Sequence, residues 1–251
     1  MTDRLAGSGA DAPAGQVAGR VGDPRRPRPD VETGPLHPSR GGGEPIDTLD
    51  DDEAGLYALV DQLRRIRALT TGGVFETDLG PLTARLREVA DRLEDASASP
   101  ERRQAVAWST GDYVANCPVV GRSNALAPPV EFEILEDGTL RGEVTLGLEY
   151  QGPPACVHGG IVSLLFDVVL GRANFHAGAT GMTVYLDVDY RSPTPVLEPI
   201  VVTGRQVRVD GRKIWSQGAI HADGRLCATA EGMFVEPGGL LLENRRRLAG
   251  G

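Results

Sequence analysis

The sequence is poor in cysteine, lysine and aromatic residues. Its 251 residues include only three cysteines, Cys117, Cys156 and Cys227, and they form no C-x-x-C pair. Neither a disulfide framework nor a zinc ribbon is therefore expected. No apolar run approaches the roughly 20 residues of a membrane span, and the first residues lack a charged-then-apolar signal segment. We therefore expect a cytoplasmic protein that does not bind a membrane.

Positive charge comes almost entirely from arginine, because Lys213 is the only lysine. The formal net charge of −9 and the pI of about 5.0 argue against general nucleic-acid binding. The chain has no Walker-type loop, dinucleotide fingerprint or G-x-S-x-G elbow. Its histidines lack metal-ligand spacing, so we expect neither a metal nor a cofactor.

Composition divides the chain into four parts. Residues 1–47 have almost no large apolar side chains and are roughly one third Gly plus Pro, which predicts a disordered arm. Residues 48–98 carry apolar side chains at helical spacing around Gly72 and Gly73, which predicts a helical hairpin. The main domain is expected over residues 105–237, followed by a flexible tail at 238–251.

The second predicted helix of the hairpin has a narrow apolar stripe formed by Leu82, Leu86, Val89 and Leu93. Their alternating spacings of four and three suit pairing with the first helix. A hairpin packed on the main domain is the preferred interpretation. A separate partner-binding module is the alternative.

The main domain has the pattern of six strands interrupted by one helix. Asp137-Gly138, Asp210-Gly211 and Asp223-Gly224 predict short antiparallel hairpins. The helix is expected from near His158 to about Ala173, and it is apolar on nearly every side. Together these elements predict an α+β fold in which a curved antiparallel sheet wraps a central helix. The expected strands are 130–135, 140–148, 182–191, 200–209, 214–221 and 226–235.

Candidate chemistry gathers around this helix. The segment Tyr150-Gln151-Gly152-Pro153-Pro154-Ala155-Cys156-Val157-His158-Gly159-Gly160 leads into it, and free N–H groups at a helix start can donate to an anion or a carbonyl oxygen. Asp167 lies among apolar residues of the helix, so we expect a buried carboxylate that is paired or poised for chemistry. Thr183 begins a strand whose alternation puts it on one face with Tyr185 and Asp187.

These motifs resemble those of the hotdog-fold acyl-CoA thioesterases, and more narrowly the PaaI-type and mammalian thioesterase-superfamily-member branch. The resemblance covers about Ala105 to Pro237. The residues that carry it are the Gln-Gly-Pro-Pro-x-x-Val-His-Gly-Gly segment, Asp167 nine residues after His158, Met182-Thr183, and the segment from Tyr190 to Pro195.

The resemblance implies hydrolysis of acyl-CoA by a homodimer or homotetramer with sites at the subunit interface. Asp167 would be the general base or nucleophile, and the Gly159 N–H would polarise the thioester carbonyl. Thr183, from the neighbouring subunit, would help to hold the attacking water. His158 would shape the loop beside Gly160.

Some family members have Asn six residues before the His, where this chain has Gly152, so Gln151 is the candidate substitute. Arg191 and Arg212 are candidates for binding the phosphates of coenzyme A. Two alternatives remain open: a non-catalytic hotdog module that binds acyl-CoA or another apolar ligand and signals to a partner, and a hydratase or dehydratase of the same fold.

Overall fold

The computed structural model describes residues 51–103 and 115–236. The predictions for the arm at 1–47 and the tail at 238–251 fall outside them. The helices are α1 (Asp51–Thr70), α2 (Gly80–Ala96) and α4 (Gly159–His176), and η1 (Leu148–Tyr150) is a short 3₁₀ helix. The strands are β1 (Glu131–Ile134), β2 (Leu140–Thr145), β3 (Met182–Tyr190), β4 (Pro199–Asp210), β5 (Lys213–Ala222) and β6 (Arg225–Val235).

The six strands form one antiparallel sheet in the order β1-β2-β4-β5-β6-β3, so β1 and β3 are its edges. The three predicted hairpins are confirmed between β1 and β2, β4 and β5, and β5 and β6. Their glycines Gly138, Gly211 and Gly224 have φ values of 80°, 56° and 73°. That left-handed backbone favours glycine and explains the turn chemistry of the sequence.

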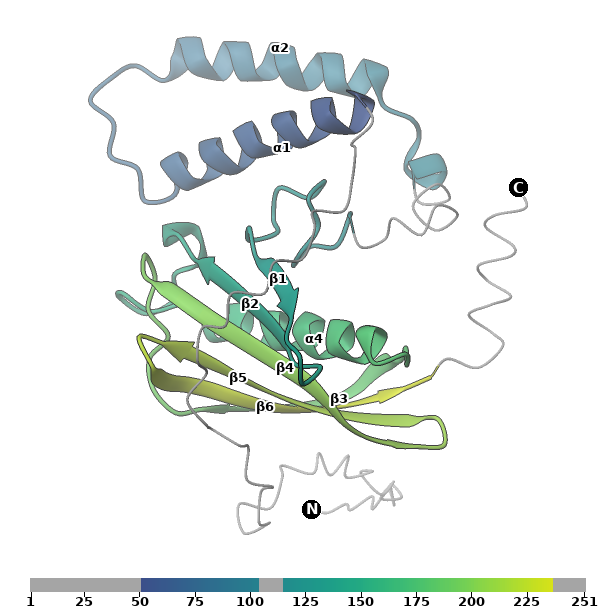
Figure 1. The fold of residues 1–251 in the computed structure, drawn as a ribbon. Coiled ribbons are helices and arrows are strands. Elements are labelled where there is room, and N and C mark those ends of the chain that lie inside the picture. The colour runs from purple at the N-terminus through teal and green to yellow at the C-terminus, as the bar shows by residue number, and fades with distance from the viewer. Residues whose placement is uncertain (1–50, 104–114, 237–251) are drawn as a thin grey trace, which may run out of the picture. The chain divides into compact units, whose positions relative to one another are not determined.

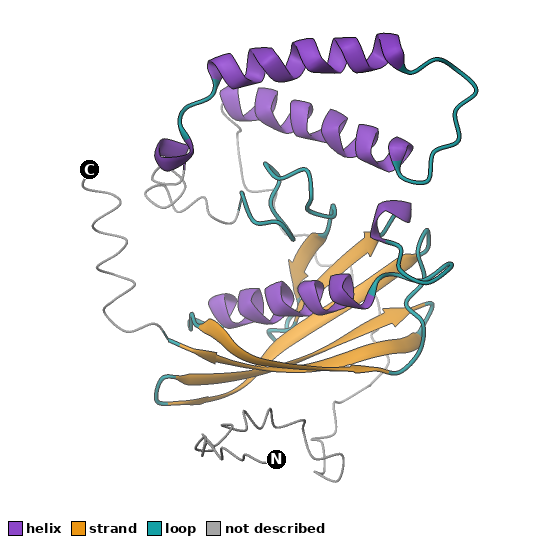
Figure 2. Cartoon of the chain, turned by 180° about the vertical axis from the view of Figure 1, so that it is seen from behind, coloured by secondary structure: helices purple, strands orange, loops and turns teal. Residues whose placement is uncertain are grey.

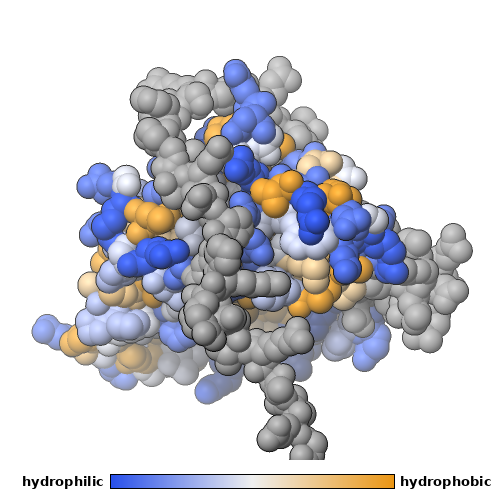
Figure 3. Space-filling view, turned by 90° about the horizontal axis from the view of Figure 1, so that it is seen from below, coloured by the Kyte–Doolittle hydropathy of each residue, from blue (hydrophilic) through white to orange (hydrophobic). Residues whose placement is uncertain are grey.

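Helix α4 lies against one face of the sheet (Figures 1 and 2) and contacts strands β2 to β6. Its residues Leu165, Phe166, Val169 and Leu170 are fully buried. They pack with apolar side chains of the sheet into the main core. The opposite side of the molecule, seen from below, mixes hydrophilic and hydrophobic residues (Figure 3). The predicted α+β arrangement of a sheet around a central helix is therefore confirmed.

Three glycines allow α4 to approach the sheet closely. Gly204 of β4 pairs with Gly218 of β5, and Gly232 lies on β6. A Cβ added at any of the three would lie 3.1–3.2 Å from a δ-carbon of Leu170. At Gly218 it would also lie 2.4 Å from the Thr203 carbonyl oxygen. Larger side chains on these strands would therefore push α4 away from the sheet.

A β-bulge changes which face of β3 carries Thr183. Thr183 pairs with Phe234 and Tyr185 with Met233, so Val184 is an extra residue between them. Cross-strand partners share a face of a sheet, and Phe234 is buried beneath α4. The prediction that Thr183 faces the same way as Tyr185 is therefore wrong, because simple alternation fails at the bulge.

Helix α1 contacts the sheet domain through two arginines, and it carries one buried valine. Val60 is 4% exposed. The Arg64 guanidinium donates to the carbonyl oxygens of Gly121 and Asn124 at 2.9 and 3.0 Å, and Arg67 reaches Tyr150. Helix α2 has no buried residue, so the stripe predicted for helix pairing is exposed. Its residues Leu82, Leu86, Val89 and Leu93 are 39–53% exposed.

Candidate functional site

The start of α4 leaves one backbone donor free. His158 is the N-cap residue, and its Nδ1 accepts a hydrogen bond of 3.0 Å from the Gly160 N–H. The N–H groups of Ile161 and Val162 donate to the His158 carbonyl oxygen. Among the residues that the structure describes, the Gly159 N–H has no hydrogen-bond partner. A free amide at the positive end of a helix is suited to bind an anionic or polarised oxygen.

The loop before α4 is built around Gly152. Its N–H donates to the Cys156 carbonyl oxygen at 2.9 Å, and the His158 N–H donates to the Tyr150 carbonyl oxygen at 2.9 Å. A Cβ at Gly152 would lie 2.8 Å from the His158 Cα, so an asparagine here would force the loop to move. The neighbouring Gln151, the candidate substitute, is exposed.

Two residues beside Gly159 were not predicted as part of the site. The Tyr190 hydroxyl donates to the Gly159 carbonyl oxygen at 2.9 Å and lies 2.7 Å from the Ser163 hydroxyl. Tyr190 closes β3, and in the sequence it is named only as the start of the segment to Pro195 that carries the family resemblance. Its contact with the first turn of α4 depends on how the strand crosses the helix, which local pattern does not encode.

Asp167 and Thr183 form a second polar centre on α4. The Thr183 hydroxyl donates to Asp167 Oδ1 at 2.7 Å. This contact forms within one chain, whereas the resemblance implies a Thr183 from the neighbouring subunit. The reason is that a short loop turns the chain from the end of α4 back along β3. Asp167 is half-buried and Thr183 is exposed, so the carboxylate that we expect to be buried is partly accessible in the single chain. Asp167 lies beside β3, which is an edge of the sheet among residues 51–103 and 115–236.

The Gly159 amide and the Asp167 carboxylate lie well apart on the same helix. They are eight residues apart in α4, which corresponds to about 12 Å along the axis at 1.5 Å per residue. Helix α4 thus carries two polar groups. The Gly159 N–H lies at its first turn, beside Tyr190 and Ser163, and the Asp167 carboxylate, which accepts from the Thr183 hydroxyl, lies two turns later.

The two candidate arginines lie in different places. Arg191 directly follows Tyr190, and its guanidinium is 2.6 Å from an Asp189 carboxylate oxygen. Arg212 lies in the β4–β5 turn and donates to the Glu236 carbonyl oxygen at 2.6 and 3.1 Å. The loop before α4 meets the segment that leads into β4, where the Val157 N–H donates to the Thr194 carbonyl oxygen, whereas Arg212 follows the other end of β4. Arg212 and Gly159 are therefore not brought together within one chain.

Over residues 51–103 and 115–236, no three His, Cys, Asp or Glu side chains cluster in a way that could hold a metal ion. Within the same ranges, no helix has the length and apolar character needed to cross a membrane.

Curated relatives match part of the chain. Acyl-coenzyme A thioesterase THEM4 of Rattus norvegicus is 33% identical over 92 residues, which is 36% of this chain and 40% of that protein. An uncharacterised protein of Schizosaccharomyces pombe is 35% identical over 95 residues, which is 35% of this chain and 54% of that protein. The chain thus spans about 40% of the length of the THEM4 relative. No protein-family model matches the chain.

A solved structure gives the broader match. A crystal structure described as a thioesterase superfamily protein is 40% identical, with a TM-score of 0.64. The match covers 72% of this chain and 94% of the solved one. The resemblance inferred from the loop and helix motifs is thereby confirmed, together with the hotdog fold class. The chain belongs to the thioesterase superfamily.

Proposed function

We propose that this protein hydrolyses acyl-CoA thioesters to a free acid and coenzyme A. One observation carries the proposal: a carboxylate held by a threonine hydroxyl, Asp167 with Thr183, lies on the helix whose first turn leaves the Gly159 N–H free. Membership of the thioesterase superfamily and similarity to proteins named acyl-CoA thioesterases support it.

The chemistry requires an activated water and a stabilised oxyanion. In the proposed reaction the Gly159 N–H donates to the thioester carbonyl. Asp167 either removes a proton from the attacking water, or attacks the carbonyl itself and expels the thiolate to form an anhydride that water then hydrolyses. Thr183 orients the carboxylate by donating to Oδ1, which leaves Oδ2 for the water. The leaving thiolate needs little protonation, because a free thiol has a pKa of about 8.5. A positioned base contributes roughly 10²–10⁴-fold to the rate.

The spacing on α4 indicates that two copies of the chain form each site. A reacting carbonyl and its water lie within about 3 Å of both the donor and the base. One α4 separates Gly159 and Asp167 by about 12 Å, so a single chain cannot bring both to one carbonyl. We infer that the amide of one copy works with the carboxylate of a second copy in a symmetric homodimer, which contains two such sites.

The surface around Asp167 is suited to a second copy. Strand β3 is an open edge of the sheet, and its Met182, Val184 and Tyr185 side chains are 45–61% exposed. Leu164 and Phe175, on α4, are also exposed. Apolar side chains beside an unpaired strand favour pairing with another chain.

Coenzyme A binding would use a cation near the amide end of α4. Arg191 is the better candidate, since it follows Tyr190, whose hydroxyl contacts Gly159. Arg212 could contribute only from another copy, because it lies at the opposite end of β4.

The test is an assay of free-thiol release from short, long and aromatic acyl-CoAs, with Asp167→Asn and Thr183→Ala beside the wild type. We expect Asp167→Asn to lose at least about 100-fold in kcat, as is typical for loss of a positioned base. Undiminished hydrolysis by Asp167→Asn would remove the proposed mechanism. Tight binding of acyl-CoA without thiol release by the wild type would instead support a non-catalytic binding module.

A further inference from the structure

Tyr190 places a hydroxyl group directly on the first turn of α4. Its O–H donates to the Gly159 carbonyl oxygen at 2.9 Å, and the Ser163 hydroxyl lies 2.7 Å from the Tyr190 oxygen. The Ser163 hydroxyl is farther, at 3.3 Å, from the same carbonyl oxygen. Each hydroxyl has one hydrogen to donate, so the shorter contacts give a chain in which Ser163 donates to Tyr190 and Tyr190 donates to Gly159. The Tyr190 ring also packs on this turn, because a Cβ built at Gly159 would lie 3.5 Å from it.

This contact holds the part of α4 that has the greatest backbone freedom. Gly159 and Gly160 are the first two residues of the helix, and two successive glycines make a helix end prone to fray. The Gly159 carbonyl belongs to the peptide directly after the free N–H, and the two peptides meet at the Gly159 Cα. The direction of the N–H therefore depends on the two torsion angles at Gly159. A hydrogen bond that fixes the carbonyl limits both angles.

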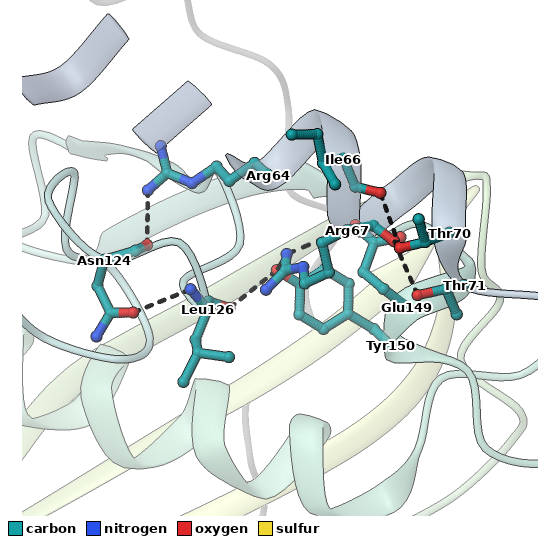
Figure 4. Close-up of polar contacts among 9 residues, drawn as sticks. All are labelled: Arg64, Ile66, Arg67, Thr70, Thr71, Asn124, Leu126, Glu149 and Tyr150. Carbon is teal, nitrogen blue, oxygen red and sulfur yellow. Dashed lines mark hydrogen bonds and ion pairs between the residues drawn. The ribbon is translucent and has the colours of Figure 1, made fainter. Parts of the chain in front are cut away.

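The other side of the free amide is held through Tyr150. The Tyr150 carbonyl oxygen accepts the His158 N–H at 2.9 Å. Tyr150 is itself fixed at its hydroxyl, which accepts a hydrogen bond of 2.6 Å from Arg67 and donates to the Leu126 carbonyl oxygen at 3.1 Å (Figure 4). The Gly159 N–H thus lies between a contact from the loop on one side and a contact from strand β3 on the other.

The end of β3 is fixed firmly enough to act as an anchor. Directly after Tyr190, the N–H groups of Arg191 and Ser192 both donate to the Cys227 carbonyl oxygen of β6, at 2.8 and 3.0 Å. The Ser192 hydroxyl donates to the Leu226 carbonyl oxygen at 2.6 Å. The Tyr190 hydroxyl is therefore presented to α4 by a strand end that is bonded to its neighbour.

Strand β3 contacts both polar groups of α4. Thr183 near its start donates to Asp167, and Tyr190 at its end donates to Gly159. We propose that Tyr190 is a positioning residue whose hydroxyl keeps the Gly159 N–H directed at the substrate carbonyl. The inference rests on the proposed function and adds to it a residue that acts through Gly159 without touching the reacting atoms.

A double-mutant cycle tests whether Tyr190 acts through the amide. Thiol release from an acyl-CoA is measured for Tyr190→Phe, which loses only the hydroxyl, in the wild type and in Gly159→Pro, which lacks the N–H. In the wild type, Tyr190→Phe should lower kcat by about 3–10-fold and change KM by less than about twofold, because one hydrogen bond is lost. In Gly159→Pro the same change should leave kcat unaltered, because no amide remains to be positioned. A merely structural role would reduce kcat equally in both backgrounds, and that result would overturn the proposal.

The control for this cycle is Tyr57→Phe, the same substitution on α1. The guanidinium carbon of Arg122 lies 4.8 Å from the centre of the Tyr57 ring, and phenylalanine keeps that contact. Tyr57→Phe should therefore leave kcat and KM unchanged. A loss of kcat as large as that of Tyr190→Phe would show that the effect is not specific to the first turn of α4, and would contradict the proposal.

Hydrogen exchange separates the positioning role from the proposed function. Exchange of the backbone amides in a peptide that spans residues 157–165 is followed by mass spectrometry without substrate. It should be about 3–10-fold faster in Tyr190→Phe than in the wild type, and unchanged in Tyr57→Phe, because the first turn of α4 opens more often without the hydroxyl. Faster exchange in Tyr190→Phe, with no thiol release by the wild type, would refute the proposed function and leave the anchoring of Gly159 by Tyr190 standing. Unchanged exchange and undiminished hydrolysis in Tyr190→Phe would refute the positioning role alone.

Discussion

Replacing Gly159 by proline removes a single N–H at the start of α4 with little other change. Gly159 is the first helical residue after the His158 cap, a position where proline is well tolerated. His158 has φ −60° and ψ 132°, the extended backbone that a residue before proline prefers. A Cβ at position 159 would lie 3.5 Å from the Tyr190 ring, an ordinary van der Waals contact.

Two variants therefore differ in one donor. Gly159→Ala keeps the N–H, and Gly159→Pro removes it, while the carbonyl that accepts from Tyr190 remains in both. Loss of one oxyanion donor costs about 2.7–4 kcal/mol, so kcat of the proline variant should fall by about 10²–10³-fold relative to the alanine variant.

The assay is steady-state thiol release from an acyl-CoA, with thermal unfolding of both variants as the control for folding. Similar unfolding temperatures and a 10²–10³-fold difference in kcat would support the role of the amide. Equal turnover in the two variants would refute it, because the oxyanion would then be stabilised elsewhere.

Three further predictions concern assembly and stability. Gly159→Pro and Asp167→Asn chains, mixed in equal amounts and allowed to re-associate, should regain about a quarter of wild-type turnover if each site uses two copies. Half of the dimers would then contain one chain of each kind, and each of these would have one intact site out of two. No recovery of turnover would assign both groups to one chain. Gly218→Ala should lower the free energy of unfolding by about 1–3 kcal/mol in urea titrations, since the alanine Cβ would lie 2.4 Å from the Thr203 carbonyl oxygen. Gly55→Ala is the control: its Cβ would have no atom within 4 Å, so it should not destabilise the protein. Burial lowers the pKa of His221 in the folded protein, so the contribution of His221 to stability is present above the ordinary His pKa of about 6.5 and is lost as the pH falls toward the folded-state pKa. His221→Asn should therefore reduce the difference in unfolding free energy between pH 7.5 and pH 5.5. An unchanged difference would contradict the role of His221.

The elements of the main domain could be predicted because their signals are local. Apolar periodicity identified α4, and the Asp-Gly pairs identified turns whose glycines have positive φ. The loop motif led to the correct superfamily because its glycines and His158 form the cap of α4.

The features that could not be predicted depend on contacts between distant segments. The extra residue Val184 in β3 has no local signature, yet it sets the face of Thr183. Asn174 has no exposed surface, and its Oδ1 accepts from Ser216 on β5, 42 residues away. Arg67 has the sequence pattern of an ordinary surface charge of α1, but the fold brings it to Tyr150.

The glycines beneath α4 have a consequence for the distance between sites. Because Gly204, Gly218 and Gly232 let Leu170 rest directly on three strands, the helix has little freedom to slide or tilt. The helix then holds its amide and its carboxylate at a constant separation. In the proposed dimer these two groups belong to different sites, so a rigid α4 in each copy would fix the distance between the two sites rather than the size of one substrate.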